Sequence, residues 1–278
     1  MDFPKEFLRC VDTINNNNYN YGNEVLYQNC GFSCLKDTGK LSSAIWLIGK
    51  SYSADPTRSA PKDTFSNKGL GSSFERIATE LLNSENYEEF YNQLENLREK
   101  KYTYTNPRSD LKILEETVSL VHTLNTMIKN AMSKVAEDKK LKKLDSDNVV
   151  SFCSKFLHFM CPHLFFIIDS YSRNGGHTLF STRTNQRTLY IQDQKDDPQN
   201  MVIDSTVKKH FHDDYLPSPS ASYHEPAIKD YYKHCLRAYG LARFLHKNGK
   251  NCARQITDDP TSRYMPRLVD AILMRITD

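Results

Sequence analysis

One carboxylate in the sequence stands between a long apolar region and a polar, basic one. The apolar segment Val149 to Met160 is followed by a second apolar run, Leu164 to Ile168. Asp169 comes next, directly ahead of Ser170 and Arg173. A carboxylate at the edge of an apolar floor can support positive charge that develops on a substrate. It can equally cap the next helix, because its side-chain oxygen accepts a hydrogen bond from a free backbone N–H.

A basic segment without acids follows this aspartate. Between Ser170 and Gln192 the sequence has no Asp or Glu but three arginines. Arginine contacts to phosphates position a protein on DNA, and an exposed tyrosine can stack on a base. The candidate DNA- or base-binding residues of this segment are Ser170, Tyr171, Arg173, Arg183 and Arg187.

A second polar group follows the apolar stretch Leu41 to Ile48, which contains the only tryptophan, Trp46. This stretch is either a buried strand or a buried helix, because the periodicity of a short apolar run does not distinguish the two. The polar residues after it form either a solvated loop or further DNA contacts. They are Lys50, Ser51, Tyr52 and Arg58.

Several common catalytic fingerprints are missing. Residues 48–51 resemble the end of a phosphate-binding loop, but Ala44 stands where that motif needs a glycine. The sequence contains no Gly-x-Gly-x-x-Gly, Gly-x-Ser-x-Gly or His-Glu-x-x-His motif. A P-loop hydrolase is therefore excluded, and the usual dehydrogenase and hydrolase signatures are absent.

The cysteines argue against both disulfides and a metal site. Seven of them lie at irregular spacing in a chain of 278 residues, which indicates reduced thiols. Structural zinc sites usually show two tight ligand pairs. Here one pair is Cys30 and Cys34, and a second cluster of Cys and His residues falls on one expected helix and its end: Cys153, His158, Cys161 and His163. We predict no metal and no other cofactor, and we expect His158 to be a hydrogen-bonded core residue.

The composition is that of a folded chain with a sizeable core. Hydrophobic residues make up 38% and charged residues 26%, and the 14 Phe and 16 Tyr are too many for a disordered chain. The longest apolar run is far shorter than the roughly 20 residues of a membrane-spanning helix. The net charge of +3 does not by itself indicate a nucleic-acid-binding protein. With no secretory signal visible, we expect a cytoplasmic protein without a membrane partner.

The pattern of expected elements is mostly helical. The longest helix has an apolar stripe from Leu111 to Val135, with Ser109 as its expected N-cap. A nearly apolar helix over Val149 to Met160 is expected to pack against it in the core. Further helices are expected over residues 3–16, 72–82, 87–97, 227–246 and 264–275, with an exposed loop over 55–71.

The order of these features resembles the helix-hairpin-helix DNA glycosylase superfamily. In that family a helix is followed by an apolar stretch, a catalytic Asp and a short turn into an Arg-bearing helix. Asp169, Ser170 and Arg173 match this pattern behind the helix Val149 to Met160. The family's glycine-rich hairpin is not present, because this chain has Leu144-Asp-Ser-Asp-Asn148 instead.

Two longer patterns resemble a group of bacterial proteins with this glycosylase-like core. They are Ser154 to Phe159 with Ile168 to Ser170, and Trp46 to Tyr52 with Arg58. This resemblance implies excision of a modified base, such as glucosylated hydroxymethylcytosine in phage DNA, in anti-phage defence. The implied fold is mostly α, a helical glycosylase-like bundle with a long irregular insertion.

The resemblance further implies one glycosylase-like unit over residues 1–278. Its expected parts are an N-terminal helical and loop part (1–108), core helices with the catalytic Asp (109–173), the insertion (174–224) and C-terminal helices (225–278).

The resemblance also implies chemical roles. Asp169 stabilises the positive charge that forms on deoxyribose as the N-glycosidic bond breaks. A lysine ahead of the Asp makes some family members lyases through a Schiff base, but Lys155 lies closer to Asp169 than the family's lysine does. We therefore expect a monofunctional enzyme that uses water and flips its target nucleotide out of double-stranded DNA.

A second hypothesis is a non-catalytic helical protein that binds nucleic acid or another partner. The near-neutral charge and the missing hairpin glycines favour it, whereas Asp169 after an apolar run favours the enzyme. The setting of this side chain distinguishes the two. An open position beside basic groups supports catalysis, and sealing against a helix end supports capping.

Overall fold

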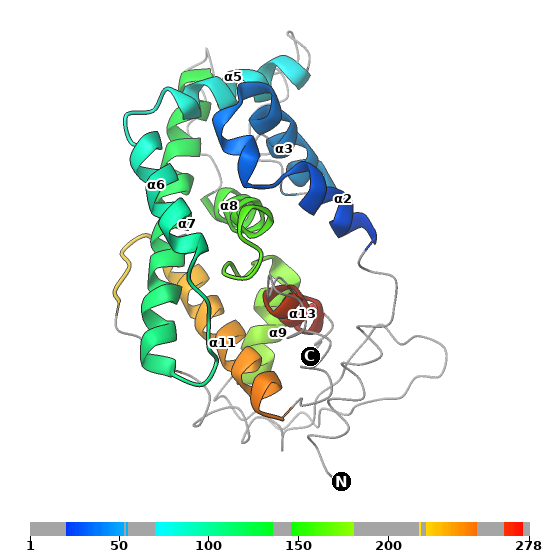
Figure 1. Ribbon diagram of the computed structural model, residues 1–278, viewed down its shortest axis with the longest axis vertical. Helices are drawn as coiled ribbons and strands as arrows, with labels where there is room; N and C mark the ends of the chain where they lie inside the picture. The colour runs from blue at the N-terminus through cyan, green and yellow to red at the C-terminus, as the bar shows by residue number, and fades with distance from the viewer. Residues whose placement is uncertain are drawn as a thin grey trace.

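The computed structural model describes residues 21–52, 54, 70–135, 146–180, 217, 221–248 and 264–274. Within these ranges the regular structure is entirely helical, which confirms the expectation of a mostly α fold (Figure 1). The elements are α2 (Tyr21–Asn29), the 3-10 helix η1 (Phe32–Lys36), α3 (Thr38–Ser51), α5 (Leu70–Leu82), α6 (Tyr87–Arg98), α7 (Pro107–Val135), α8 (Ser146–Met160), α9 (Ser170–Phe180), α11 (Pro226–Asn248) and α13 (Tyr264–Leu273).

Helix α7 is the longest described element and the spine of the bundle. It packs against α5, α6, α8 and α11, as Figure 1 shows for its green ribbon running down one side of the molecule. Its buried stripe includes Leu114, Val118, Val121, Leu124 and Ile128, at the spacing of one helix face. The predicted packing of this helix against α8 is confirmed.

The start of α7 differs from the expectation for Ser109. The helix begins at Pro107, where the missing backbone N–H costs nothing and the fixed φ suits the first turn. Asn106 precedes it, and its side-chain oxygen accepts a hydrogen bond of 3.4 Å from the backbone N–H of Ser109. Ser109 is thus inside the first turn, and its hydroxyl donates to the carbonyl oxygen of Asn106.

The stretch around Trp46 is a helix, so the strand alternative is wrong. Asp37 caps α3 by accepting a hydrogen bond of 2.8 Å from the backbone N–H of Lys40. Its buried residues are spaced three and four apart, which buries one face of a helix: Leu41, Ala44, Ile45 and Ile48. Trp46 lies on the opposite face and is 44% exposed.

Helix α8 runs through the centre of the bundle, where Figure 1 shows it nearly end-on. It contacts α2, α3, α7 and α11. Phe152, Phe156 and Phe159 are all buried, together with the polar Ser154, Lys155 and His158. This helix therefore carries polar side chains into an otherwise apolar core, and it ends where the candidate site begins.

Other expected elements are found with shifted bounds or lie outside the described residues. The helices expected over 72–82, 87–97, 227–246 and 264–275 correspond to α5, α6, α11 and α13. Helix α9 continues to Phe180, so residues 174–180 of the expected insertion are helical. The helix expected over 3–16 lies outside the described residues, and no helix within them is long and apolar enough to cross a membrane.

Candidate active site

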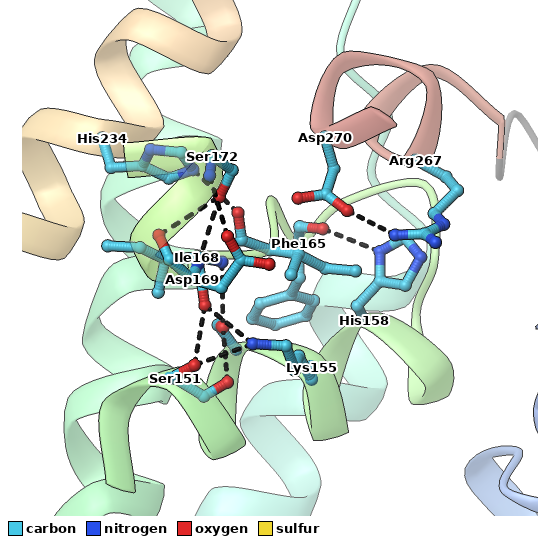
Figure 2. Close-up of polar contacts among 12 residues, drawn as sticks. Ser151, Lys155, His158, Phe165, Ile168, Asp169, Ser172, His234, Arg267 and Asp270 are labelled. Carbon is cyan, nitrogen blue, oxygen red and sulfur yellow. Dashed lines mark hydrogen bonds and ion pairs between the residues drawn. The ribbon is translucent and has the colours of Figure 1, made fainter. Parts of the chain in front are cut away.

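Four ionisable side chains converge where α8, the start of α9 and α13 meet (Figure 2). Lys155 comes from α8, Asp169 immediately precedes α9, and Arg267 and Asp270 come from α13. Lys155, Arg267 and Asp270 are 1%, 6% and 2% exposed, respectively, and Asp169 is partly buried. Charged groups are costly to remove from water, so a buried cluster of this kind is typical of functional sites.

Asp169 is the N-cap of α9. Its Oδ1 accepts a hydrogen bond of 2.8 Å from the backbone N–H of Ser172, and its own N–H donates to Ser172 Oγ at 3.1 Å. This reciprocal pair holds the first turn of the helix and fixes the carboxylate rotamer. The second carboxylate oxygen, Oδ2, makes no hydrogen bond within the described part of the chain. The capping interpretation is therefore correct, and it leaves one oxygen of the same carboxylate available.

The residue before Asp169 is bonded to α8 through both of its backbone polar groups. The carbonyl oxygen of Ile168 accepts hydrogen bonds from Ser151 Oγ at 2.8 Å and from Lys155 Nζ at 3.0 Å. The N–H of Ile168 donates to Ser154 Oγ at 3.2 Å. Lys155 also donates to Ser151 Oγ at 2.7 Å, so its amine is used in positioning this peptide.

Side-chain hydrogen bonds also hold the backbone of the residues before Ile168, in the segment between α8 and α9. Four successive carbonyl oxygens accept hydrogen bonds from buried side chains rather than from a helix or sheet. The pairs are His158 Nδ1 to Phe165 (2.9 Å), Tyr231 Oη to Phe166 (2.9 Å), His234 Nε2 to Ile167 (2.7 Å) and Lys155 Nζ to Ile168 (3.0 Å). Satisfying each buried carbonyl individually fixes an irregular backbone in one conformation.

The two histidines of this arrangement are neutral. Burial lowers the pKa of His158 to about 3 and that of His234 to about 4. His158 donates from Nδ1 and accepts from the hydroxyl of Tyr27 at Nε2, over 2.7 Å. His158 is thus the hydrogen-bonded core histidine that the sequence predicts.

Burial also shifts the pKa values of the central charged groups. It lowers the pKa of Lys155, an effect opposed by Asp169 and Asp270. It raises the pKa of Asp270 to about 7; Arg267, in an ion pair with Asp270, opposes this shift, and Asp169 adds to it. Asp270 consequently exchanges its proton near neutral pH.

Tyr52, the C-cap of α3, is the predicted residue of that segment that reaches this cluster. Its ring centroid lies 5.7 Å from Lys155 Nζ and 5.8 Å from the guanidinium carbon of Arg267. The ring face therefore borders both cations. Lys50 and Ser51 are exposed in the last turn of α3, and Arg58 lies outside the described residues.

The first turn of α9 carries the remaining predicted contacts. Ser170 is exposed, Tyr171 is 68% exposed and Arg173 is partly buried. Because these residues follow Asp169 directly, the site and an exposed aromatic lie at the same helix end. Arg183 and Arg187 lie outside the described residues.

Sequence reasoning missed the contribution of α13. Arg267 and Asp270 are one helical turn apart within a short, largely apolar helix, which was the available signal. Such a pair is usually a surface ion pair, and only the packing of α13 on α9 and α11 buries it. His234 on α11 was missed as well, because its burial also depends on the packing of helices that are distant in the sequence.

Comparison with known proteins identifies no relative, since no family model, curated protein or solved structure matches the chain.

The five described cysteines are free and buried: Cys30, Cys34, Cys153, Cys161 and Cys235. Over the described ranges, no group of three or more His, Cys, Asp or Glu side chains is arranged to hold a metal ion.

Proposed function

We propose that the protein is a DNA N-glycosylase that hydrolyses the bond between deoxyribose and a flipped-out modified base, leaving an abasic site. The observation that carries the proposal is the fixed position of Asp169. Its carboxylate follows a segment in which four successive carbonyls are held by buried side chains. A carboxylate that is already in place stabilises the positive charge forming on the sugar without a cost of reorganisation.

The first turn of α9 supports DNA as the substrate. Tyr171 projects an aromatic ring, 68% exposed, two residues after Asp169. An exposed aromatic can stack on a base or fill the space of a flipped nucleotide. Arg173, one helical turn from Asp169, supplies a cation for a flanking phosphate. The base contact, the phosphate contact and the carboxylate then act at one helix end.

The setting of Lys155 favours a monofunctional enzyme. A lyase needs an amine that reaches C1′ of the sugar to form a Schiff base. The Nζ of Lys155 already donates hydrogen bonds to both Ser151 and Ile168. We assign it to positioning the peptide before Asp169, with water as the nucleophile.

One observation favours the alternative, a non-catalytic helical protein that binds nucleic acid or another partner. Asp169 caps α9, and capping alone accounts for an aspartate at this position. The alternative gives no role to the buried carboxylate of Asp270 beside it. For this reason we favour the enzyme.

The proposal is tested with duplex oligonucleotides that each carry one defined base: glucosylated hydroxymethylcytosine, hydroxymethylcytosine, uracil or cytosine. The protein is incubated with each duplex, and abasic sites are detected by strand cleavage in hot alkali. We expect cleavage of a duplex with a modified base, and of the glucosylated one if the protein acts in anti-phage defence. Absence of abasic sites in all four duplexes would contradict the proposed function.

A further inference from the structure

Asp270 is a second carboxylate in the candidate site, and the role proposed for Asp169 does not account for it. It lies on α13, and Figure 2 shows its side chain pointing from that helix towards the space above Asp169 and Lys155. One of its oxygens, Oδ2, pairs with Arg267. The other, Oδ1, is buried without a described partner at normal hydrogen-bond geometry, and the nearby Ser172 hydroxyl acts to lower the pKa of Asp270. A buried acceptor without a partner is costly, and native proteins keep such atoms mainly where a ligand or water binds.

A close backbone contact between α9 and α13 fixes how α13 packs. A Cβ atom added to Gly175 in α9 would lie 1.9 Å from the carbonyl oxygen of Leu273. Leu273 follows Asp270 by three residues, so the contact anchors the same turn of α13. The position of Asp270 relative to the start of α9 is therefore set by backbone packing.

We propose that Asp270 is the general base of the hydrolysis, its Oδ1 accepting a proton from the water that attacks the sugar. This inference rests on the proposed function. As the oxygen of that water bonds to C1′, the C1′–N bond breaks and the base nitrogen keeps its electron pair. The departing base takes a proton from solvent, and Asp270 returns its proton to solvent. Asp169 faces the positive charge on the sugar during this step.

The surroundings of Asp270 suit the uptake and release of a proton by its carboxylate. The charged groups that face it are Arg267 on its own helix, Lys155 on α8 and Asp169 at the start of α9. Burial, with a contribution from Asp169, raises the pKa of Asp270 to about 7, where a general base is most effective. A second carboxylate beside the first is the arrangement that divides such roles in glycoside hydrolysis.

The test compares single-turnover base release by the wild-type protein, Asp270→Asn and Asp270→Glu between pH 5 and 9. The probe is the duplex with one glucosylated hydroxymethylcytosine, or whichever duplex of the panel the wild-type protein cleaves. Asp230→Asn, an exposed carboxylate on α11, is the matched control. We expect Asp270→Asn to slow release by about a hundredfold or more and to abolish the fall in rate below pH 7. Asp270→Glu should retain part of the rate together with that fall.

DNA affinity and the unfolding midpoint are measured for each variant, so that a failure to fold is recognised. If Asp270→Asn does not fold, Asp270→Glu decides: a wild-type rate with no fall below pH 7 would overturn the inference. A folded Asp270→Asn with the wild-type rate and pH profile would overturn it as well, while leaving the proposed function intact. Absence of base release by the wild-type protein would overturn both.

Discussion

Gly175 and Leu273 bring the backbones of α9 and α13 into direct contact. A Cβ atom at position 175 would lie 1.9 Å from the carbonyl oxygen of Leu273 and 2.8 Å from its carbonyl carbon. Only a glycine allows this approach, because any side chain would overlap backbone atoms that cannot move independently. The contact links the helix that Asp169 caps to the helix that carries Asp270.

Gly175→Ala should therefore separate the two helices. We expect a loss of about 1–3 kcal/mol in the free energy of unfolding, the usual cost of overpacking a tight contact. Gly176→Ala is the matched control, because its Cβ would meet only side-chain atoms of Arg237 and His234 at 3.6–3.8 Å. That variant should be neutral or more stable by up to about 1 kcal/mol, since alanine favours helix more than glycine does. Urea unfolding measures the free energy of unfolding of both variants. Equal changes in the two variants would contradict the close contact between Gly175 and Leu273.

Asp270 should make folding stability depend on pH. Its pKa is about 7 in the folded protein, against an ordinary value of 3.8, so the folded state keeps a proton that the unfolded state has lost. The stabilisation from this proton is fully present below about pH 4 and is lost as the pH rises towards 7. Asparagine does not titrate. The unfolding free energy of the wild-type protein minus that of Asp270→Asn should thus fall by about 1.4 kcal/mol per pH unit across this window.

Urea unfolding at pH 4, 5, 6 and 7 measures this difference. The buried histidines titrate in both proteins and cancel in the subtraction. A difference that stays constant from pH 4 to 7 would show that Asp270 is ionised throughout.

The helices could be predicted from the sequence, but the full candidate site could not. Hydrophobic spacing at period 3.6 predicts α7 and α8, because each buries a continuous stripe. Asp169 was found because an acid after an apolar run is locally unusual. Asp270 was not, because its burial depends on α13 packing onto α9, a contact between distant parts of the chain. The Trp46 stretch was ambiguous since an apolar run of that length suits either a strand or a helix.

The amine of Lys155 should not form a covalent intermediate with DNA. It donates hydrogen bonds to Ser151 and Ile168, so it is already engaged. With the cleaved duplex and sodium borohydride present, we expect abasic sites but no protein–DNA adduct on a denaturing gel. Lys155→Met is the control: an adduct that forms with the wild-type protein and disappears in this variant would identify Lys155 as a lyase nucleophile.

Arg173 should contribute one phosphate contact. We expect Arg173→Ala to weaken binding to all duplexes and to reduce the slope of log affinity against log salt by about 0.9. Lys112→Ala removes an exposed cation from α7 and should leave the slope unchanged. Fluorescence anisotropy from 50 to 200 mM salt measures both. An Arg173→Ala slope equal to that of the wild-type protein would remove this residue from the interface.

The most direct test of the whole account is base release by Asp169→Asn. Asparagine caps helices about as well as aspartate, so folding should change by at most about 1 kcal/mol. Its neutral amide cannot offset the positive charge on the sugar, and we expect release to slow by about a hundredfold or more, with DNA affinity retained. Ser172→Ala removes the hydroxyl that accepts from the Asp169 N–H but keeps the carboxylate, so it should lower stability and slow release much less than Asp169→Asn does. Base release by Asp169→Asn at close to the wild-type rate would show that Asp169 is only a cap and would contradict the glycosylase proposal.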